Sequence, residues 1–265
     1  MMMQSNFISL ENADLTIITL TYNSSKYIQK CISSIIKACN NLGGNKICHI
    51  VIDGKSQDNT VELIKDISPY SLIFYREAKG IYDALNYAVS LVKSPYLMYV
   101  HADDEIDKCF LVEMFQKLIH LNQNQNYILY GTVDFINGKS EILFSRKPPF
   151  FISHFNNKTS IIFHPNAIYS TALEKAYPYN IDKGLRADQD HIIGIVANAK
   201  LIRVVSANYQ FRMSNASSTM KNLSACGGKK MSRLSLATIY VRLFETKLIK
   251  RFFMKLKGQS YWSIQ

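Results

Sequence analysis

The first hundred residues alternate between short apolar runs and segments in which apolar residues recur at helical spacing. Four apolar, β-branched or aromatic runs predict buried strands, at residues 15–20, 47–52, 72–75 and 96–100. The segments between them predict amphipathic helices, at residues 27–36, 58–67 and 81–92. Strands and helices that alternate through short connections are typical of βαβ units. The pattern therefore predicts a mainly parallel central sheet flanked by helices.

Polar residues indicate where two of these helices begin. Ser24 or Ser25 is expected to cap the first helix, and Asp58 is expected to serve only as the cap of the second. Beyond residue 107 the regular alternation stops. The pattern then predicts a helix, a hairpin around Asn137-Gly138, another helix and a strand, at residues 110–121, 133–144, 186–198 and 201–205.

Charge separates the end of the chain from the rest. The 265 residues carry a formal net charge of +11, and from Lys221 onward ten lysines and arginines face a single acid, Glu245. Residues 234–256 combine helical apolar spacing with cations. We therefore expect a domain over residues 1–213, with halves 1–110 and 111–213, and a basic, mainly helical C-terminal tail over 214–265. The positive and negative charges of residues 1–220 nearly balance, and the tail has no known sequence motif of a nucleic-acid-binding domain. Both observations argue against nucleic-acid binding.

Several classes of protein are disfavoured by composition. The five cysteines form no C-x-x-C pair, which predicts reduced thiols in a cytosolic protein and no zinc site. Residues 1–12 lack the layout of a signal peptide, and no window holds the roughly 18 consecutive apolar residues of a membrane span. We expect a soluble or peripheral protein.

Polar clusters follow three of the predicted strands. They are Thr21-Tyr22-Asn23, Asp53-Gly54-Lys55-Ser56 and Asp103-Asp104. In a parallel sheet, ligands bind beyond the carboxyl ends of the strands, so these clusters are expected to converge on one crevice.

The adjacent carboxylates Asp103 and Asp104 repel each other unless a cation or hydrogen-bond donors balance them. Mg²⁺ and Mn²⁺ bind carboxylate oxygens together with substrate phosphates, so the pair suits a metal that bridges a diphosphate. The alternative is an N-cap before a helix over residues 105–121.

Two further segments carry polar groups toward the same crevice. Asp53 is suited to accept a hydrogen bond from a base or ribose, and Gly54 would allow a close approach to the backbone. Lys79 precedes a predicted helix and could neutralise phosphate, while Asp83 in the first turn also suits the helix dipole. A turn at Asp53 and a purely structural Asp83 are the alternatives.

Together, these stretches resemble the family 2 glycosyltransferases with the Rossmann-like GT-A fold. The resemblance is carried by residues 17–23, 51–60, 79–86 and 100–104, and it covers about the first 110 residues. The Gly-Ile-Tyr-Asp-Ala-Leu-Asn form of residues 80–86 is most similar to enzymes that assemble bacterial surface polysaccharides, including colanic-acid-type transferases.

The resemblance implies a hexosyltransferase that uses a nucleotide-sugar donor, taken as a UDP-sugar, with Mn²⁺ or Mg²⁺. Thr21 and Tyr22 would line the nucleotide pocket, and Asp53 would read the base. Lys79 and Asp83 would lie near the ribose and sugar. Asp103 and Asp104 would form the metal site, with Asp104 as the direct ligand.

The second half resembles the family less closely. His164 matches an acceptor-side position, although a lone histidine between Phe163 and Pro165 also suits a packed core. Asp188 is expected to be the catalytic base of an inverting transfer, with Asp190 as the alternative. Residues two apart on a helix point about 200° apart, so one of them faces the sugar. Arg203 and Arg212 are expected at the surface.

The acceptor implied by the resemblance is a glycan or a polyprenyl-linked oligosaccharide. The basic residues 229–257 would then contact an anionic membrane, at the inner face of the plasma membrane. Packing of the tail on the domain is the alternative. A nucleotide-sugar-binding protein without catalysis is the rival function.

Overall fold

The computed structural model describes residues 7, 9–43, 46–77, 79–118, 120–122, 124–148 and 162–213. The predicted basic tail over 214–265 lies outside the described residues, so its helix and its membrane contact stay predictions. No helix among the described residues is long and apolar enough to cross a membrane.

A single mixed sheet forms the centre of the fold, in the order β3-β2-β1-β4-β8-β6-β9-β5, with β7 paired to β6. The first four strands are parallel and match the predicted ones. They are β1 (Leu15–Thr21), β2 (Ile47–Asp53), β3 (Leu72–Tyr75) and β4 (Tyr96–Tyr99). The predicted α/β class is therefore confirmed.

The second half of the sheet contains both strand directions. It is built from β5 (Glu105–Ile106), β6 (Tyr127–Ile136), β7 (Ile142–Arg146), β8 (Ala167–Ser170) and β9 (Lys200–Arg212). The predicted hairpin is confirmed as β6 and β7, and β8 joins the two halves by pairing antiparallel with β4 and β6. Strand β9 runs beyond the predicted residue 205, because Ala207 and Tyr209 continue the buried alternation.

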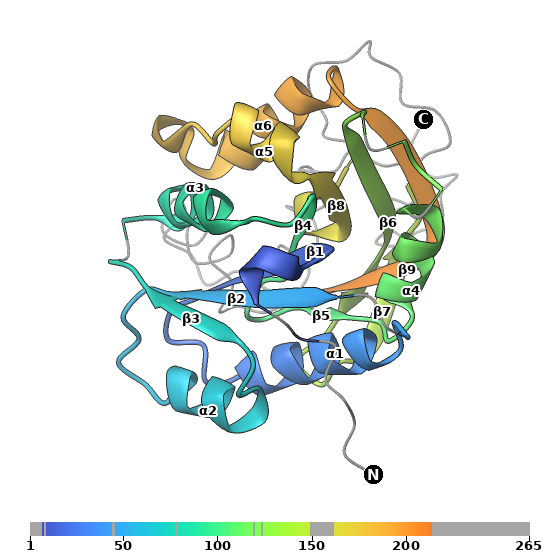
Figure 1. Cartoon of the computed structure of the whole chain (residues 1–265). Coiled ribbons are helices and arrows are strands. Elements are labelled where there is room, and N and C mark those ends of the chain that lie inside the picture. Colours follow the sequence, from blue (N-terminus) through green and yellow to red (C-terminus); the bar gives the residue numbers. More distant parts are fainter. Residues whose placement is uncertain are drawn as a thin grey trace, which may run out of the picture. The chain divides into compact units, whose positions relative to one another are not determined.

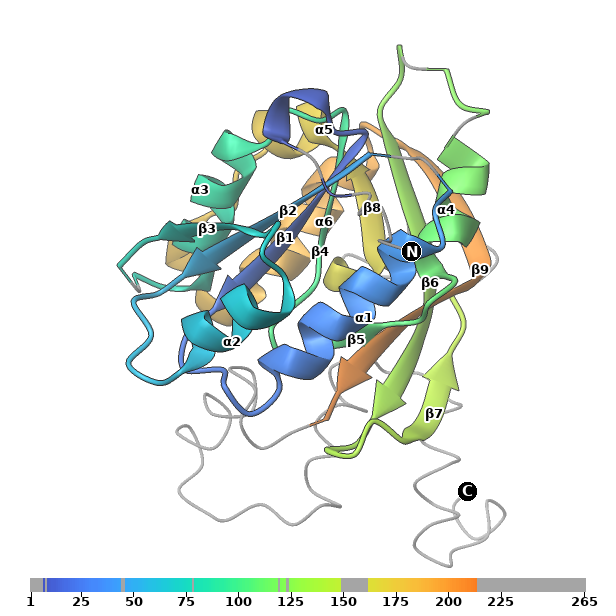
Figure 2. The same cartoon turned by 60° about the horizontal axis from the view of Figure 1, so that its bottom comes forward.

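Helices cover both faces of the sheet (Figures 1 and 2). One face carries α1 (Ile28–Asn40), α2 (Thr60–Ile67) and α4 (Phe110–Leu118), and the other carries α3 (Ile81–Leu91), α5 (Thr171–Ala176) and α6 (Ala187–Val196). Short 3-10 turns complete the described elements: η1 (Leu10–Asn12), η2 (His164–Asn166) and η3 (Ile181–Arg186).

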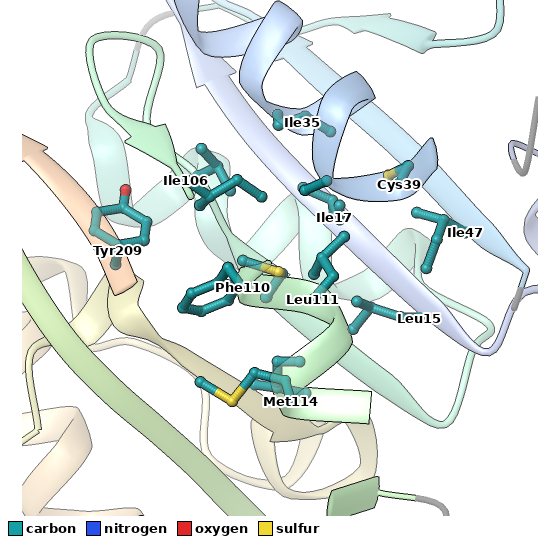
Figure 3. Close-up of a cluster of buried hydrophobic side chains, with 14 of the residues drawn as sticks. Leu15, Ile17, Ile35, Cys39, Ile47, Ile106, Phe110, Leu111, Met114 and Tyr209 are labelled. Carbon is teal, nitrogen blue, oxygen red and sulfur yellow. The ribbon is translucent and has the colours of Figure 1, made fainter. Parts of the chain in front are cut away.

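Alternation along the strands supplies two apolar cores. Leu15 and Ile17 of β1 face the α1 and α4 side, whereas Ile18 faces the α3 side. Figure 3 shows the first core, in which Phe110 and Met114 of α4 are fully buried. Each such side chain contributes about 1.5–3 kcal/mol of burial free energy. These cores fix the strand ends that carry the polar clusters.

The N-cap residues of α1 and α2 differ from the predicted ones. The prediction that Ser24 or Ser25 caps α1 is wrong, because Tyr27 holds the N-cap position and no side chain caps the helix. The amides of Ser24 and Ser25 instead donate across to Thr60 Oγ1 (2.8 Å) and Asp58 Oδ2 (3.2 Å). The prediction that Asp58 caps α2 is also wrong in position, because Asn59 holds the N-cap position, although Asp58 Oδ1 accepts the Thr60 N–H at 3.1 Å.

Candidate functional site

The loops that follow β1 and β2 meet at one edge of the sheet. Thr21 and Asp53 are register partners, and Gly54 N donates to Thr21 O at 2.8 Å. Tyr22 is 54% exposed, and a Cβ on Gly54 would lie 3.1 Å from Cδ2 of its ring. The glycine therefore lets an exposed aromatic face lie against this edge.

Asp53 is buried and braces its own loop. Its Oδ2 accepts the Ser56 N–H at 2.9 Å, and its Oδ1 accepts the Ser56 hydroxyl at 2.6 Å. The Ser56 hydroxyl oxygen accepts the N–H of Asn23, which has a positive φ of 48°, at 2.9 Å. Asp53 can stabilise this turn and still accept a hydrogen bond from a ligand, since a carboxylate offers about four lone pairs.

Thr21 has the feature most typical of an incomplete site. Its side chain is buried, and its Oγ1 has no hydrogen-bond partner among the residues that the structure describes. Buried hydroxyls are nearly always satisfied by protein, water or ligand. The described residues therefore leave the hydrogen bonding of Thr21 Oγ1 incomplete.

Asp83 lies beside the end of β3, held by a residue that the sequence did not single out. Arg76 donates through Nε and Nη2 to the two Asp83 oxygens at 2.8 and 2.9 Å, and its amide donates to Asp53 O at 2.9 Å. The Arg76 hydrogen bond lowers the pKa of Asp83. Lys79 is exposed nearby on the same connection. A cation directly after a predicted strand was the signal for Arg76.

Asp103 and Asp104 follow β4, whose next residue, Val100, donates its N–H to Ile18 O of β1 at 2.9 Å. Asp104 is 1% exposed; its Oδ2 accepts the Tyr209 hydroxyl at 2.7 Å, and its Oδ1 accepts the Arg212 N–H at 2.8 Å. Burial and the Asp103 charge raise the pKa of Asp104. Asp103 is only half-buried. The N-cap alternative is wrong, because β5 separates the pair from α4.

Arg212 corrects the expectation that it lies at the surface, since its side chain is fully buried. Its Nε donates to Asp103 O at 2.7 Å, and its other nitrogens contact Asn137 O and Glu105. The guanidinium also lies 4.7 Å from the centroid of the Tyr27 ring. A buried arginine is tolerated when oxygens surround it, and here it fixes the Asp103–Glu105 backbone.

His164 lies beneath this edge, 6% exposed, with its ring stacked on Tyr99 at a centroid distance of 4.7 Å. Its Nε2 lies 2.5 Å from the Tyr179 hydroxyl oxygen. Burial lowers the pKa of His164 well below its ordinary value. His164 is therefore packed in the core, as the alternative interpretation predicted, and its direct contact with an acceptor stays a prediction.

Asp188 and Asp190 occupy the first turn of α6 and point to different neighbours. Asp190 Oδ2 lies 3.9 Å from Lys183 Nζ, and its side chain is 40% exposed. Asp188 hydrogen-bonds to Tyr82 of α3 through both its amide and its carboxylate. Asp188 is thereby adjacent to the segment 79–86, whereas Asp190 is not shown to contact it.

This edge carries oxygen ligands of the kind that a hard divalent cation prefers. Asp103 and Asp104 offer carboxylate oxygens, and Asp104 already uses both of its oxygens as hydrogen-bond acceptors. The described residues contain no group of three or more histidines, cysteines, aspartates or glutamates that could hold a metal ion.

The family model for glycosyl transferase family 2 matches residues 16–177. Among curated proteins, a PGL/p-HBAD biosynthesis glycosyltransferase of Mycobacterium bovis is 26% identical over 211 residues, which cover 73% of this chain and 75% of that protein. The poly(ribitol-phosphate) β-glucosyltransferase of Bacillus spizizenii is 22% identical over 205 residues, which cover 74% of this chain but 31% of the relative.

Solved structures share the fold. Residues 1–349 of Staphylococcus aureus TarS, in complex with UDP, give a TM-score of 0.62 at 19% identity, covering 90% of this chain and 74% of that one. A mannosyltransferase of Pyrobaculum calidifontis, in complex with GDP-Man and Mn²⁺, gives a TM-score of 0.56 at 15% identity, covering 92% and 69%.

Proposed function

This chain belongs to glycosyl transferase family 2, and we propose that it is an inverting, metal-assisted enzyme that transfers a hexose from a UDP-sugar to a glycan or a lipid-linked oligosaccharide of the bacterial cell surface. The observation that supports the proposal is that β1, β2 and β4 are parallel neighbours, so that the segments with Thr21, Asp53 and Asp103 follow strand ends at the same edge of the sheet. Polar groups at that edge would bind a nucleotide and its diphosphate.

The donor side is supported by both chemistry and relatives. Tyr22 offers an exposed ring for stacking on a base, and Thr21 and Asp53 offer polar atoms beside it. TarS binds UDP and UDP-GlcNAc in solved complexes, and the mannosyltransferase binds GDP-Man with Mn²⁺. We choose UDP because the TarS structures have the higher TM-scores.

The different burial of Asp103 and Asp104 favours different roles for the two carboxylates. Asp103 is half-buried and would face the cation, whereas Asp104, held by Tyr209 and Arg212, would keep the loop in place. This assigns the direct contact to Asp103, although the family resemblance favours Asp104. A divalent cation bound there would offset the charge that develops on the leaving diphosphate.

The transfer itself would be a single displacement. Asp188 would remove the proton from an acceptor hydroxyl, whose oxygen then bonds to the anomeric carbon as the bond to the diphosphate oxygen breaks. Attack opposite the leaving group inverts the anomeric centre. The contact between Asp188 and Tyr82 supports this role, because it brings Asp188 to the donor-side helix α3.

The acceptor proposal rests on the relatives and on charge. The relatives' names include poly(ribitol-phosphate) glucosylation and PGL/p-HBAD biosynthesis. The ten cations beyond residue 220 would bring the enzyme to an anionic membrane surface, where a lipid-linked acceptor is held.

The test is a panel of UDP- and GDP-sugars with Mn²⁺ and bacterial lipid extract, scored by nucleoside diphosphate release. Asp188→Asn should reduce kcat about 10²–10⁴-fold, as expected for loss of a general base, with unchanged UDP affinity. Asp190→Asn is the matched control on the same helix turn and should retain transfer. Loss in Asp190→Asn alone would move the base to Asp190. UDP binding without transfer from any donor would favour the non-catalytic alternative.

A further inference from the structure

A buried carboxylate contacts α6, the helix that carries the candidate base Asp188. Glu174 of α5 has a fully buried side chain, and three groups surround it. The hydroxyls of Tyr99 and Tyr179 donate to Oε2 at 2.7 and 3.1 Å, and His191 Nε2 lies 3.0 Å from Oε1. A buried charge without such donors would be very unfavourable, so the cluster is a specific arrangement.

The cluster draws on several separate parts of the fold. The two tyrosines that donate to Glu174 come from β4 and from the segment before η3, and His191 comes from α6. The Tyr179 hydroxyl oxygen also lies 2.5 Å from His164 Nε2 of η2.

Stacked rings connect this cluster to the N-terminus of α6. The rings of Tyr179 and His191 stack at a centroid distance of 3.9 Å, and those of Tyr82 and Tyr179 stack at 5.8 Å. His191 is three residues after Asp188, so both side chains lie on the same side of α6.

Tyr82 completes the connection on the other side of Asp188. Burial and the Asp188 charge raise the pKa of the Tyr82 hydroxyl, which is hydrogen-bonded to the backbone and the side chain of Asp188. The amide of Asp188 belongs to the first turn of α6, where helix N–H groups have no partner within the helix. Tyr82 thus fixes both the backbone and the side chain of one residue.

We infer that Tyr82 and Glu174 are positioning residues for the transfer reaction: Tyr82 orients the Asp188 carboxylate, and Glu174 holds the Tyr179 and His191 rings against which Tyr82 and α6 rest. The inference depends on the proposed function, since it takes Asp188 as the base. It also connects the two substrates, because Tyr82 lies within the donor-side segment 79–86 while Asp188 acts on the acceptor. Neither residue needs to touch substrate.

The first test is Tyr82→Phe, which removes one hydroxyl and keeps the ring that stacks on Tyr179. We expect kcat for transfer to fall about tenfold, the effect of losing a hydrogen bond to a charged group, with UDP affinity within twofold of wild type. Tyr177→Phe removes an exposed hydroxyl two residues before Tyr179 and is the matched control, with wild-type kcat. A Tyr82→Phe enzyme with wild-type kcat, or with UDP affinity reduced as much as kcat, overturns the inference.

The second test compares Glu174→Gln with Glu174→Leu. Glutamine can accept from both tyrosine hydroxyls and donate to His191 after that ring changes tautomer, so kcat should stay within about threefold of wild type. Leucine leaves three donors unpaired, and kcat should fall at least tenfold while UDP still binds. Equal kcat in both variants contradicts the role of Glu174, and Tyr82→Phe decides the inference if the leucine variant does not fold.

These outcomes are separable from failure of the proposed function. A wild-type protein that transfers no sugar from any donor contradicts the proposed function and this inference with it. An active wild type that Asp188→Asn inactivates and Tyr82→Phe leaves unchanged contradicts the inference alone.

Discussion

At the residue scale, the described core holds a histidine, His49, whose pKa is strongly lowered by burial. His49 is buried in β2 between Thr19 Oγ1 at 3.0 Å and Ser71 Oγ at 2.7 Å. Burial lowers the pKa of His49 to about 3, and burial also lowers the pKa values of His101 and His164. Between pH 6.5 and about 3, the unfolded chain therefore binds protons that the folded chain does not, so stability falls as the pH falls.

This linkage gives a prediction for His49. Lowering the pH from 7 to 5 should cost about 2 kcal/mol through His49 alone, because each pH unit below the unfolded pKa costs about 1.4 kcal/mol. His49→Gln should flatten the pH dependence of the free energy of unfolding by about one proton, measured by urea denaturation at pH 7, 6 and 5. His120→Gln, at an exposed position, is the control and should keep the wild-type slope. An unchanged slope in His49→Gln would show that His49 is charged in the fold.

At the same scale, some candidate site residues can be predicted from sequence. Asp53, Asp103 and Asp104 were candidates because each lies at or shortly after the end of an apolar run, and the ends of parallel strands converge. Arg212 and Glu174 could not, because their burial depends on partners distant in sequence, such as Asp103 for Arg212 and Tyr99 for Glu174. A charged residue reads as exposed until its partners are known.

At the element scale, the strongest sequence signals were the ones that depend on local pattern alone. The four parallel strands, α3 and the β6–β7 hairpin follow from periodicity and from Asn137-Gly138. Strand β8 was missed because it has four residues and lies between two helical turns, and its strand character comes from pairing with β4 and β6. Tertiary pairing overrides local pattern in such short strands.

The contact between β6 and β9 leads to a prediction for two glycines. A Cβ at Gly131, where the β6–β9 register shifts, would lie 2.2 Å from the Ala207 carbonyl oxygen, so Gly131→Ala should cost about 1–3 kcal/mol. Gly194 lies exposed within α6, and no atom of the described residues outside its own helix turn lies within 4 Å of an added Cβ, so Gly194→Ala should gain about 0.5–1 kcal/mol. Chemical denaturation of both variants checks the opposite signs. A neutral Gly131→Ala would mean that β9 moves freely against β6.

At the scale of the described domain, two sets of elements meet over one edge. Strands β1, β2 and β4 bring the loops proposed to bind the donor, while α6 brings Asp188 and contacts α3 through Tyr82. The sequence predicted the strands of the first set, because they follow one βαβ pattern; that their loops bind a donor stays a prediction. The second set was placed by family resemblance, and its supports in α5 and η2 have no pattern that spacing could reveal.

The central claim is that Asp103 and the neighbouring strand ends hold a metal-bound nucleoside diphosphate, and binding of UDP tests it without an acceptor. Calorimetry with Mn²⁺ should show that wild type and Asp66→Asn, an exposed change on α2, bind UDP alike. Asp103→Asn should bind at least about tenfold more weakly, and the difference should disappear when EDTA replaces Mn²⁺. Asp103 is preferred to Asp104 because replacing Asp104 also breaks its bonds to Tyr209 and Arg212. Equal UDP affinity in Asp103→Asn and wild type with Mn²⁺ would contradict the account.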